Sequence, residues 1–220
     1  MSQRHFNLTD RLLIELSSAM RVVAAKPHAH RATPSAKSDD TPDNSLSDPL
    51  NDNERKLSAQ LMRVNHSGEI AAQALYRGQA LVAQNPVLRA ELLDAADEEH
   101  DHLAWCQQRT TELGSPISLL TPIWYIGSFA IGMAAGLTSD KVSLGFLAET
   151  ERQVSKHIDG HLKKLPKQDN QSRAILEQMR EDEIRHGNQA TERGGAKLPK
   201  PIKEAMQAAS KVMTTLSHRV

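Results

Sequence analysis

The sequence has a single cysteine in 220 residues, and this scarcity excludes several classes of protein. Cys106 alone cannot form an intramolecular disulfide framework or a thiolate metal cluster. Aromatic residues make up 3% of the chain and the formal net charge is zero, so nothing in the composition points to a nucleic-acid partner. A glycine-rich dinucleotide fingerprint is absent as well, which argues against a dedicated Rossmann site for NADH.

The first residues carry charges where a secretion signal would have an apolar core. We therefore expect a protein of the reducing cytosol. Residues 1–25 are predicted to be an amphipathic helix that docks on the rest of the protein or lies on a membrane. Its apolar stripe is Leu8, Leu12, Leu13, Leu16, Met20 and Val23. Residues 26–52, rich in proline and small polar residues, are predicted to be a flexible linker.

Residues 53–220 are predicted to form one all-α domain of six helices. Capping residues and terminators mark most of the ends, with Asn51, Asp52 or Asn53 before the first helix and Asn85 before the second. The predicted helices run over about 53–84, 86–114, 120–136, 139–165, 170–194 and 200–217.

The most informative pattern is a pair of Glu-x-x-His motifs with two further glutamates. The motifs, called steps below, run from Glu99 to His102 and from Glu183 to His186, and the further glutamates are Glu69 and Glu151. Residues three apart share a face of a helix. Each of the acids lies on a largely apolar stripe, where a carboxylate costs several kcal/mol unless it is compensated. We therefore predict a metal site made by Glu69, Glu99, His102, Glu151, Glu183 and His186.

The spacing of these residues predicts a ferritin-like four-helix bundle. Glu69 and Glu99 are 30 residues apart, and Glu151 and Glu183 are 32 apart. With a turn near the middle of each interval, two helical hairpins would bring their ligands to the same height.

The alternative is that these are surface acids in a chance arrangement. A rival pair, Asp97 and His100, is rejected because its face, with Asp94 and Asp101, is predicted to be solvated.

The stretch from Leu113 to Ser139 has no charged residue and could span a bilayer by length. A span would place Glu99 and Glu151 on opposite sides of the membrane, so we predict a long hydrophobic crossover instead. Two interpretations of its composition stay open. The crossover packs tightly through its small residues, or it presents a surface to lipid or to an apolar substrate.

Carboxylate and imidazole ligands without thiolate favour iron or manganese. The glutamate of each Glu-x-x-His step is best placed to bridge two ions. Tyr76 and His157 are candidates to support the ligands, although ordinary core packing explains them equally well.

The runs Arg63–Glu69, Glu99–Leu103 and Glu183–His186, with Glu151 and His157 between them, resemble the demethoxyubiquinone hydroxylase family of ubiquinone biosynthesis. The resemblance implies two Fe²⁺ ions. Glu69 and His102 would ligate one iron, Glu151 and His186 the other, and Glu99 and Glu183 would bridge.

The resemblance also implies a monooxygenase that hydroxylates a polyprenyl benzoquinol or benzoquinone. Dioxygen would be the oxidant and NADH the source of electrons. The protein would act peripherally at the cytoplasmic face of the cell membrane, with other ubiquinone-biosynthesis proteins as partners. The alternatives are a ferritin-like ferroxidase or iron-storage protein, and a bundle in which metal is a structural clip.

Overall fold

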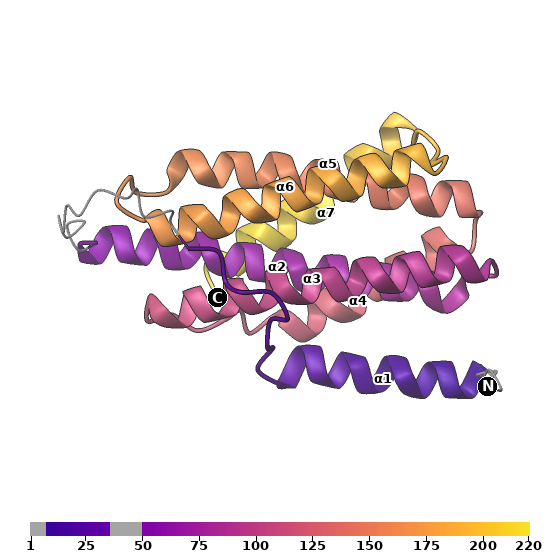
Figure 1. Ribbon diagram of the computed structural model, residues 1–220, viewed down its shortest axis with the longest axis horizontal. Coiled ribbons are helices and arrows are strands. Elements are labelled where there is room, and N and C mark those ends of the chain that lie inside the picture. Colours follow the sequence, from indigo (N-terminus) through magenta and orange to yellow (C-terminus); the bar gives the residue numbers. More distant parts are fainter. Residues whose placement is uncertain (1–7, 36–49) are drawn as a thin grey trace.

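The computed structural model describes residues 8–35 and 50–220, and within these ranges the chain forms seven α-helices and no strand (Figure 1). The helices are α1 (Leu8–Ala24), α2 (Asp52–Val82), α3 (Pro86–Glu112), α4 (Thr121–Gly136), α5 (Asp140–Lys164), α6 (Asn170–Glu192) and α7 (Lys200–Ser217). All seven were predicted, and within the described residues their ends differ by at most two or three residues.

Local side chains set these ends. Asn51 caps α2 in a capping box with Glu54, and Asn85 caps α3 ahead of a proline in the first turn. Ser139 caps α5 and Asp169 caps α6. Gly114 and Gly194, with φ of 77° and 94°, follow the ends of α3 and α6. Glycine adopts this left-handed conformation without strain, which is why it ends helices.

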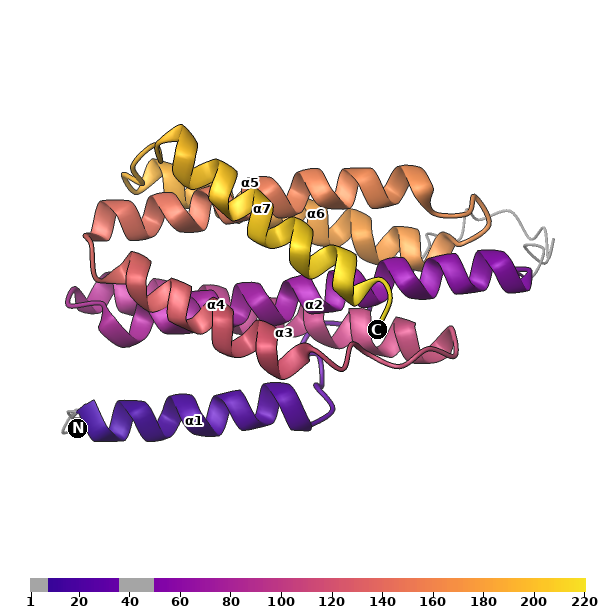
Figure 2. The same ribbon diagram turned by 180° about the vertical axis from the view of Figure 1, so that it is seen from behind.

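Helices α2 and α3 form one helical hairpin and α5 and α6 form the other, and the two hairpins lie side by side (Figures 1 and 2). This is the predicted ferritin-like four-helix bundle. Two apolar clusters fill it, one around Tyr76 and Leu92 and the other around Met62 and Met179. Along each helix the predicted acids lie between a residue of one cluster and a residue of the other, so the acids occupy the middle of the bundle.

Helix α4 is the crossover between the hairpins and runs along α2 (Figure 2). The two backbones approach closely at glycines. An ideal Cβ on Gly132 would lie 2.0 Å from the carbonyl oxygen of Leu75, and one on Gly78 would lie 2.2 Å from that of Phe129. The other side of α4 exposes Ile123 and Ile126. Tight packing through small residues is therefore confirmed, and the same helix also presents an apolar surface.

Helix α1 docks on the bundle, but through a different face from the one its apolar stripe suggested. It buries Glu15 and Ser18, and the guanidinium of Arg77 on α2 donates to Ser18 Oγ at 2.7 Å and lies 3.7 Å from Glu15. The apolar stripe is turned outward, with Leu12, Leu13, Leu16 and Met20 exposed. The physical reason is that Arg77, only 12% exposed, requires an acid beside it.

Part of the predicted linker packs on the bundle. Residues 30–34 contact α3 and α6, through hydrogen bonds that include Gln171 Nε2 to Pro34 O at 2.9 Å. The predicted flexibility of residues 36–49, like the structure of residues 1–7, lies outside the described residues. Among the helices of the described ranges, none combines the length and the apolar content that a membrane span needs.

Candidate metal centre

All six predicted side chains meet at the middle of the bundle. Helix α2 contributes Glu69, α3 contributes a Glu-x-x-His step, α5 contributes Glu151 and α6 contributes the other step. Their donor atoms form two groups, each with all members within 4.8 Å of one another. The groups are Glu69, Glu99, His102 and Glu183, and Glu99, Glu151, Glu183 and His186.

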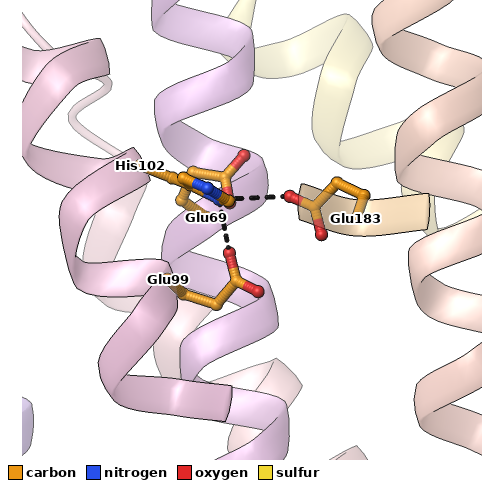
Figure 3. Close-up of side chains that lie close together, drawn as sticks. All are labelled: Glu69, Glu99, His102 and Glu183. Carbon is orange, nitrogen blue, oxygen red and sulfur yellow. Dashed lines mark hydrogen bonds and ion pairs between the residues drawn. The ribbon is translucent and has the colours of Figure 1, made fainter. Parts of the chain in front are cut away.

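Glu99 and Glu183 belong to both groups, which is the position expected of ligands shared between two ions. Figure 3 shows Glu183 reaching from α6 towards His102 of α3. All six residues are buried, with exposures between 0% and 6%. The predicted role of each as a metal ligand stays a prediction, but the geometry required for it is present.

Both histidines point Nδ1 towards the acids. His102 Nδ1 lies 3.0 Å from Glu99, 3.2 Å from Glu183 and 3.8 Å from Glu69. His186 Nδ1 lies 3.7 Å from Glu99 and 3.9 Å from Glu183. The same nitrogen of each ring is thus available at the centre, and Nε2 is left to face outward.

Each Nε2 faces an acid that the sequence reasoning missed. His102 Nε2 lies 3.1 Å from Asp182, and His186 Nε2 makes a short contact with Glu98. These acids come immediately before Glu183 and Glu99, so each Glu-x-x-His step carries the partner for the histidine of the other step. An acidic residue before both glutamates was the signal in the sequence. Such acids fix the tautomer and orientation of a ligating histidine.

Of the two supporting candidates, Tyr76 is placed at the centre. Its hydroxyl donates a short hydrogen bond to Glu151 Oε1. His157 lies farther away, on the wall of a cavity that reaches Glu69. The rival pair, Asp97 and His100, is not part of the centre, and Asp97 is exposed as predicted. The reason given for rejecting it was wrong in one respect, because Asp101 is buried under the segment that follows α1.

The acids of the centre resist ionisation in the metal-free chain. Burial raises the pKa of Glu69 to about 8 and that of Glu183 to about 7, and it raises the pKa of Glu151 well above its ordinary value. Glu99 is different. Burial opposes its ionisation too, but the positive charge of His102 and its hydrogen bond outweigh burial and lower the pKa of Glu99. A bound cation would stabilise all four carboxylates in their ionised form.

A profile of a known family matches residues 56–217, a range that contains all six side chains of the centre. The family is described as "Ubiquinone biosynthesis protein COQ7". This chain is a member of the COQ7 family. The resemblance that the motifs indicated is therefore confirmed.

Curated relatives of this COQ7-family chain share about half of its residues. The 3-demethoxyubiquinol 3-hydroxylase of Ralstonia pickettii (strain 12J) is 54% identical over 219 residues, which is 97% of this chain and 100% of the relative. The protein of the same name from Polynucleobacter necessarius subsp. necessarius (strain STIR1) is 54% identical over 211 residues, 96% of this chain and 98% of the relative.

The donor atoms of this COQ7-family centre fit a metal. Within the described chain, Glu99 Oε1, Glu151 Oε2, both carboxylate oxygens of Glu183 and His186 Nδ1 are buried without a hydrogen-bond partner. Buried polar atoms almost always have one, so a cluster of five such atoms in the middle of a bundle fits a site for a cation. Carboxylate oxygen and imidazole nitrogen are ligands that iron and manganese accept.

Two cavities reach the centre of this COQ7-family protein from different sides. The larger, about 430 Å³, lies between α2, α4, α5 and α7, is lined mainly by apolar side chains and touches Glu69. The smaller, about 170 Å³, lies between α3, α5 and α6 and touches Glu98 and His186. The first offers room for an apolar molecule, and the second offers room for water.

Proposed function

We propose that this protein is a 3-demethoxyubiquinol 3-hydroxylase that uses a di-iron centre. The observation that carries the proposal is the convergence of four carboxylates and two imidazoles beside an apolar cavity, in a chain of the COQ7 family. Relatives that carry this name match nearly the whole chain at 54% identity. Family membership favours this activity over iron storage, which needs no cavity for an organic substrate.

The reaction replaces a ring C–H bond of a polyprenyl methoxy-methyl-benzoquinol by C–OH. One atom of dioxygen enters the ring and the other leaves as water, so two electrons and two protons are consumed. NADH is the proposed source of the electrons, directly or through the quinone. The iron ions supply the reduction and activation of dioxygen when they are bound.

We assign the six side chains in two sets that share two members. Glu69 and His102 would hold one iron and Glu151 and His186 the other, and Glu99 and Glu183 would be shared between them. The support is that the geometric groups divide in the same way. The hydroxyl of Tyr76 donates to Oε1 of Glu151, and Oε2 of Glu151, which has no hydrogen-bond partner in the described structure, is left to bind a metal ion.

The larger cavity is the proposed substrate site. Its apolar walls suit a ring with an isoprenoid tail, because burying apolar surface gains roughly 25 cal/mol per Å². Glu69 at its inner end places the reacting ring beside the metal centre. His157 is one of the few polar residues on this wall.

A membrane surface is the proposed place of action, at the cytoplasmic face. Exposed apolar side chains lie on both α1 and α4, which contact each other, with Ile123 60% and Ile126 70% exposed. An apolar patch of this kind is typical of a membrane or protein contact. We expect Ile126→Glu to weaken flotation with phospholipid vesicles, whereas Ile184→Glu on α6, which changes an exposed isoleucine elsewhere, leaves it unchanged. Equal flotation of Ile126→Glu and wild type would count against the membrane surface.

Deleting the chromosomal copy and analysing membrane quinones tests the activity. We expect the demethoxy precursor to accumulate and the wild-type gene to restore ubiquinone. Glu183→Ala should fail to restore it, whereas Glu181→Ala, a change of an exposed glutamate on the same helix, should succeed. Normal ubiquinone in the deletion strain would refute the proposed function. Proteins of the same biosynthetic route are the proposed partners, and purification of complexes from membranes would identify them.

A further inference from the structure

The segment of residues 25–35, which follows α1, lies across the outer side of the metal centre. At its middle, Arg31 reaches two carboxylates on different helices. Arg31 Nε lies 2.8 Å from Asp101 Oδ2 on α3, and Arg31 Nη1 lies 2.8 Å from Asp182 Oδ2 on α6. The backbone N–H of His30 also donates to Asp101, at 2.6 Å.

Both carboxylates are buried, with side-chain exposures of 6% for Asp101 and 1% for Asp182. Buried carboxylates need a charged partner. A guanidinium has several donors in a fixed plane and can serve two carboxylates at once, which a single ammonium does less well. Because α3 belongs to one hairpin and α6 to the other, Arg31 also joins the two halves of the bundle next to the centre.

Asp182 connects Arg31 to a predicted metal ligand. The oxygen of Asp182 that accepts from Arg31 also lies 3.1 Å from His102 Nε2. The other oxygen is held by Arg185 at 2.9 Å and by Gln178 at 3.3 Å. Three side chains therefore orient the carboxylate of Asp182, and among them Arg31 holds the oxygen that faces His102.

A second route passes through an aromatic ring. The guanidinium carbon of Arg31 lies 4.7 Å from the centre of the Trp105 ring, within the range of a cation–π contact. The Trp105 ring is in turn 5.4 Å from the ring of His102. Arg31 thus contacts both Asp182 and Trp105, the two residues that lie beside the outer edge of the His102 ring.

The other histidine has a different environment. The acid that faces His186 is Glu98, whose side chain is 50% exposed, whereas Asp182 is 1% exposed. The guanidiniums beside the two acids are similar, with Arg185 49% and Arg31 39% exposed. Water can replace a contact to the exposed Glu98 at little cost, but it cannot reach the buried Asp182 in the same way. The two halves of the centre are therefore alike in their inner residues and unlike in their outer ones.

We propose that Arg31 is a positioning residue for the Glu69–His102 half of the metal centre, acting through Asp182 and Trp105. The inference deepens the proposed function and rests on its metal centre. It gives a purpose to a segment that the sequence presents only as a linker. It also predicts that loss of Arg31 affects one metal position more than the other.

Titration of the metal-free, full-length protein with Co²⁺ tests the proposal, with visible absorption as the readout of the coordination of the bound ion. Wild type should bind two ions. Arg31→Gln should weaken one of the two about 10-fold, the lower end of the effect of losing a group bonded directly to a ligating histidine, because Arg31 acts one residue farther away. Arg31→Lys, which keeps the charge but not the planar fork, should give a smaller loss at the same position.

Gln171→Ala is the matched control, since Gln171 bonds to Pro34 of the same segment and touches neither carboxylate. Thermal unfolding without metal should show similar small losses for Gln171→Ala and Arg31→Gln, whereas Co²⁺ affinity should fall only for Arg31→Gln. Equal Co²⁺ affinity in Arg31→Gln and wild type, or an equal loss in Gln171→Ala, would overturn the role of Arg31. Failure of the wild type to bind Co²⁺ would overturn the metal centre itself, and the role of Arg31 with it.

Discussion

Replacing Gly132 by alanine should force α4 away from α2. The added Cβ would lie 2.0 Å from the carbonyl oxygen of Leu75, whereas ordinary contact begins at 3.4 Å, a shortfall of about 1.4 Å. The three nearest atoms, the O, C and Cα of Leu75, all belong to the backbone of α2, so no flexible side chain can move aside. Overpacking of this kind costs about 1–3 kcal/mol, while the better helix propensity of alanine returns roughly 0.5–1 kcal/mol.

Gly127→Ala is the control in the same helix. Its Cβ would meet no atom within 4 Å, so the gain in helix propensity of roughly 0.5–1 kcal/mol should appear alone. Urea unfolding of the two metal-free variants should show Gly132→Ala less stable than wild type and Gly127→Ala more stable. Because α4 is a wall of the larger cavity, Gly132→Ala should also raise the KM for the quinol. Equal stability of the two variants would refute the close approach of α2 and α4.

Three further predictions concern single hydrogen-bonded groups. Tyr76→Phe removes the donor to Glu151, so the affinity for Co²⁺ should fall about 10-fold in a chelator competition, with little change in the far-ultraviolet circular dichroism. Asp169→Ala removes the buried cap of α6, which accepts from Ser172 N at 3.0 Å, and should lower the free energy of unfolding by about 1–2 kcal/mol in urea. For Glu149, burial opposes ionisation, but hydrogen bonds from a neighbouring arginine and glutamine outweigh burial and lower its pKa to about 2. A lowered pKa adds stability above the ordinary value of 4.5 that is lost as the pH falls towards 2, so the advantage of wild type over Glu149→Gln in unfolding should shrink across that range.

The helices and the converging side chains were predictable because their signals are local. Asn85 before a proline and Gly114 after a helix act within one turn, and a Glu-x-x-His step fixes a shared face by spacing alone. Once the turns are placed, the heights of Glu69 and Glu151 follow from counting residues. The fold and the six side chains could therefore be predicted without knowledge of distant contacts.

The outer contacts could not be predicted in this way, because they join residues far apart in the sequence. The apolar stripe of α1 indicated docking on the bundle or contact with a membrane, but it did not show that α1 docks through the face with Glu15, beside the buried Arg77 of α2. Asp101 looked solvated, but its partner Arg31 comes from a segment 70 residues earlier. Local patterns carry no information about such partners, and tertiary contacts override them.

The last helix has a consequence for the order in which the protein is completed during synthesis. Every side chain of the metal centre lies before residue 187, whereas Met206 and Met213 of α7 close one side of the larger cavity. A chain that ended at residue 198 would retain all six residues of the proposed metal centre but would lack the α7 side of the larger cavity. The residues of the proposed metal centre and those of α7 that close the cavity are thus separate in the covalent order of the polypeptide, and the residues of α7 come last.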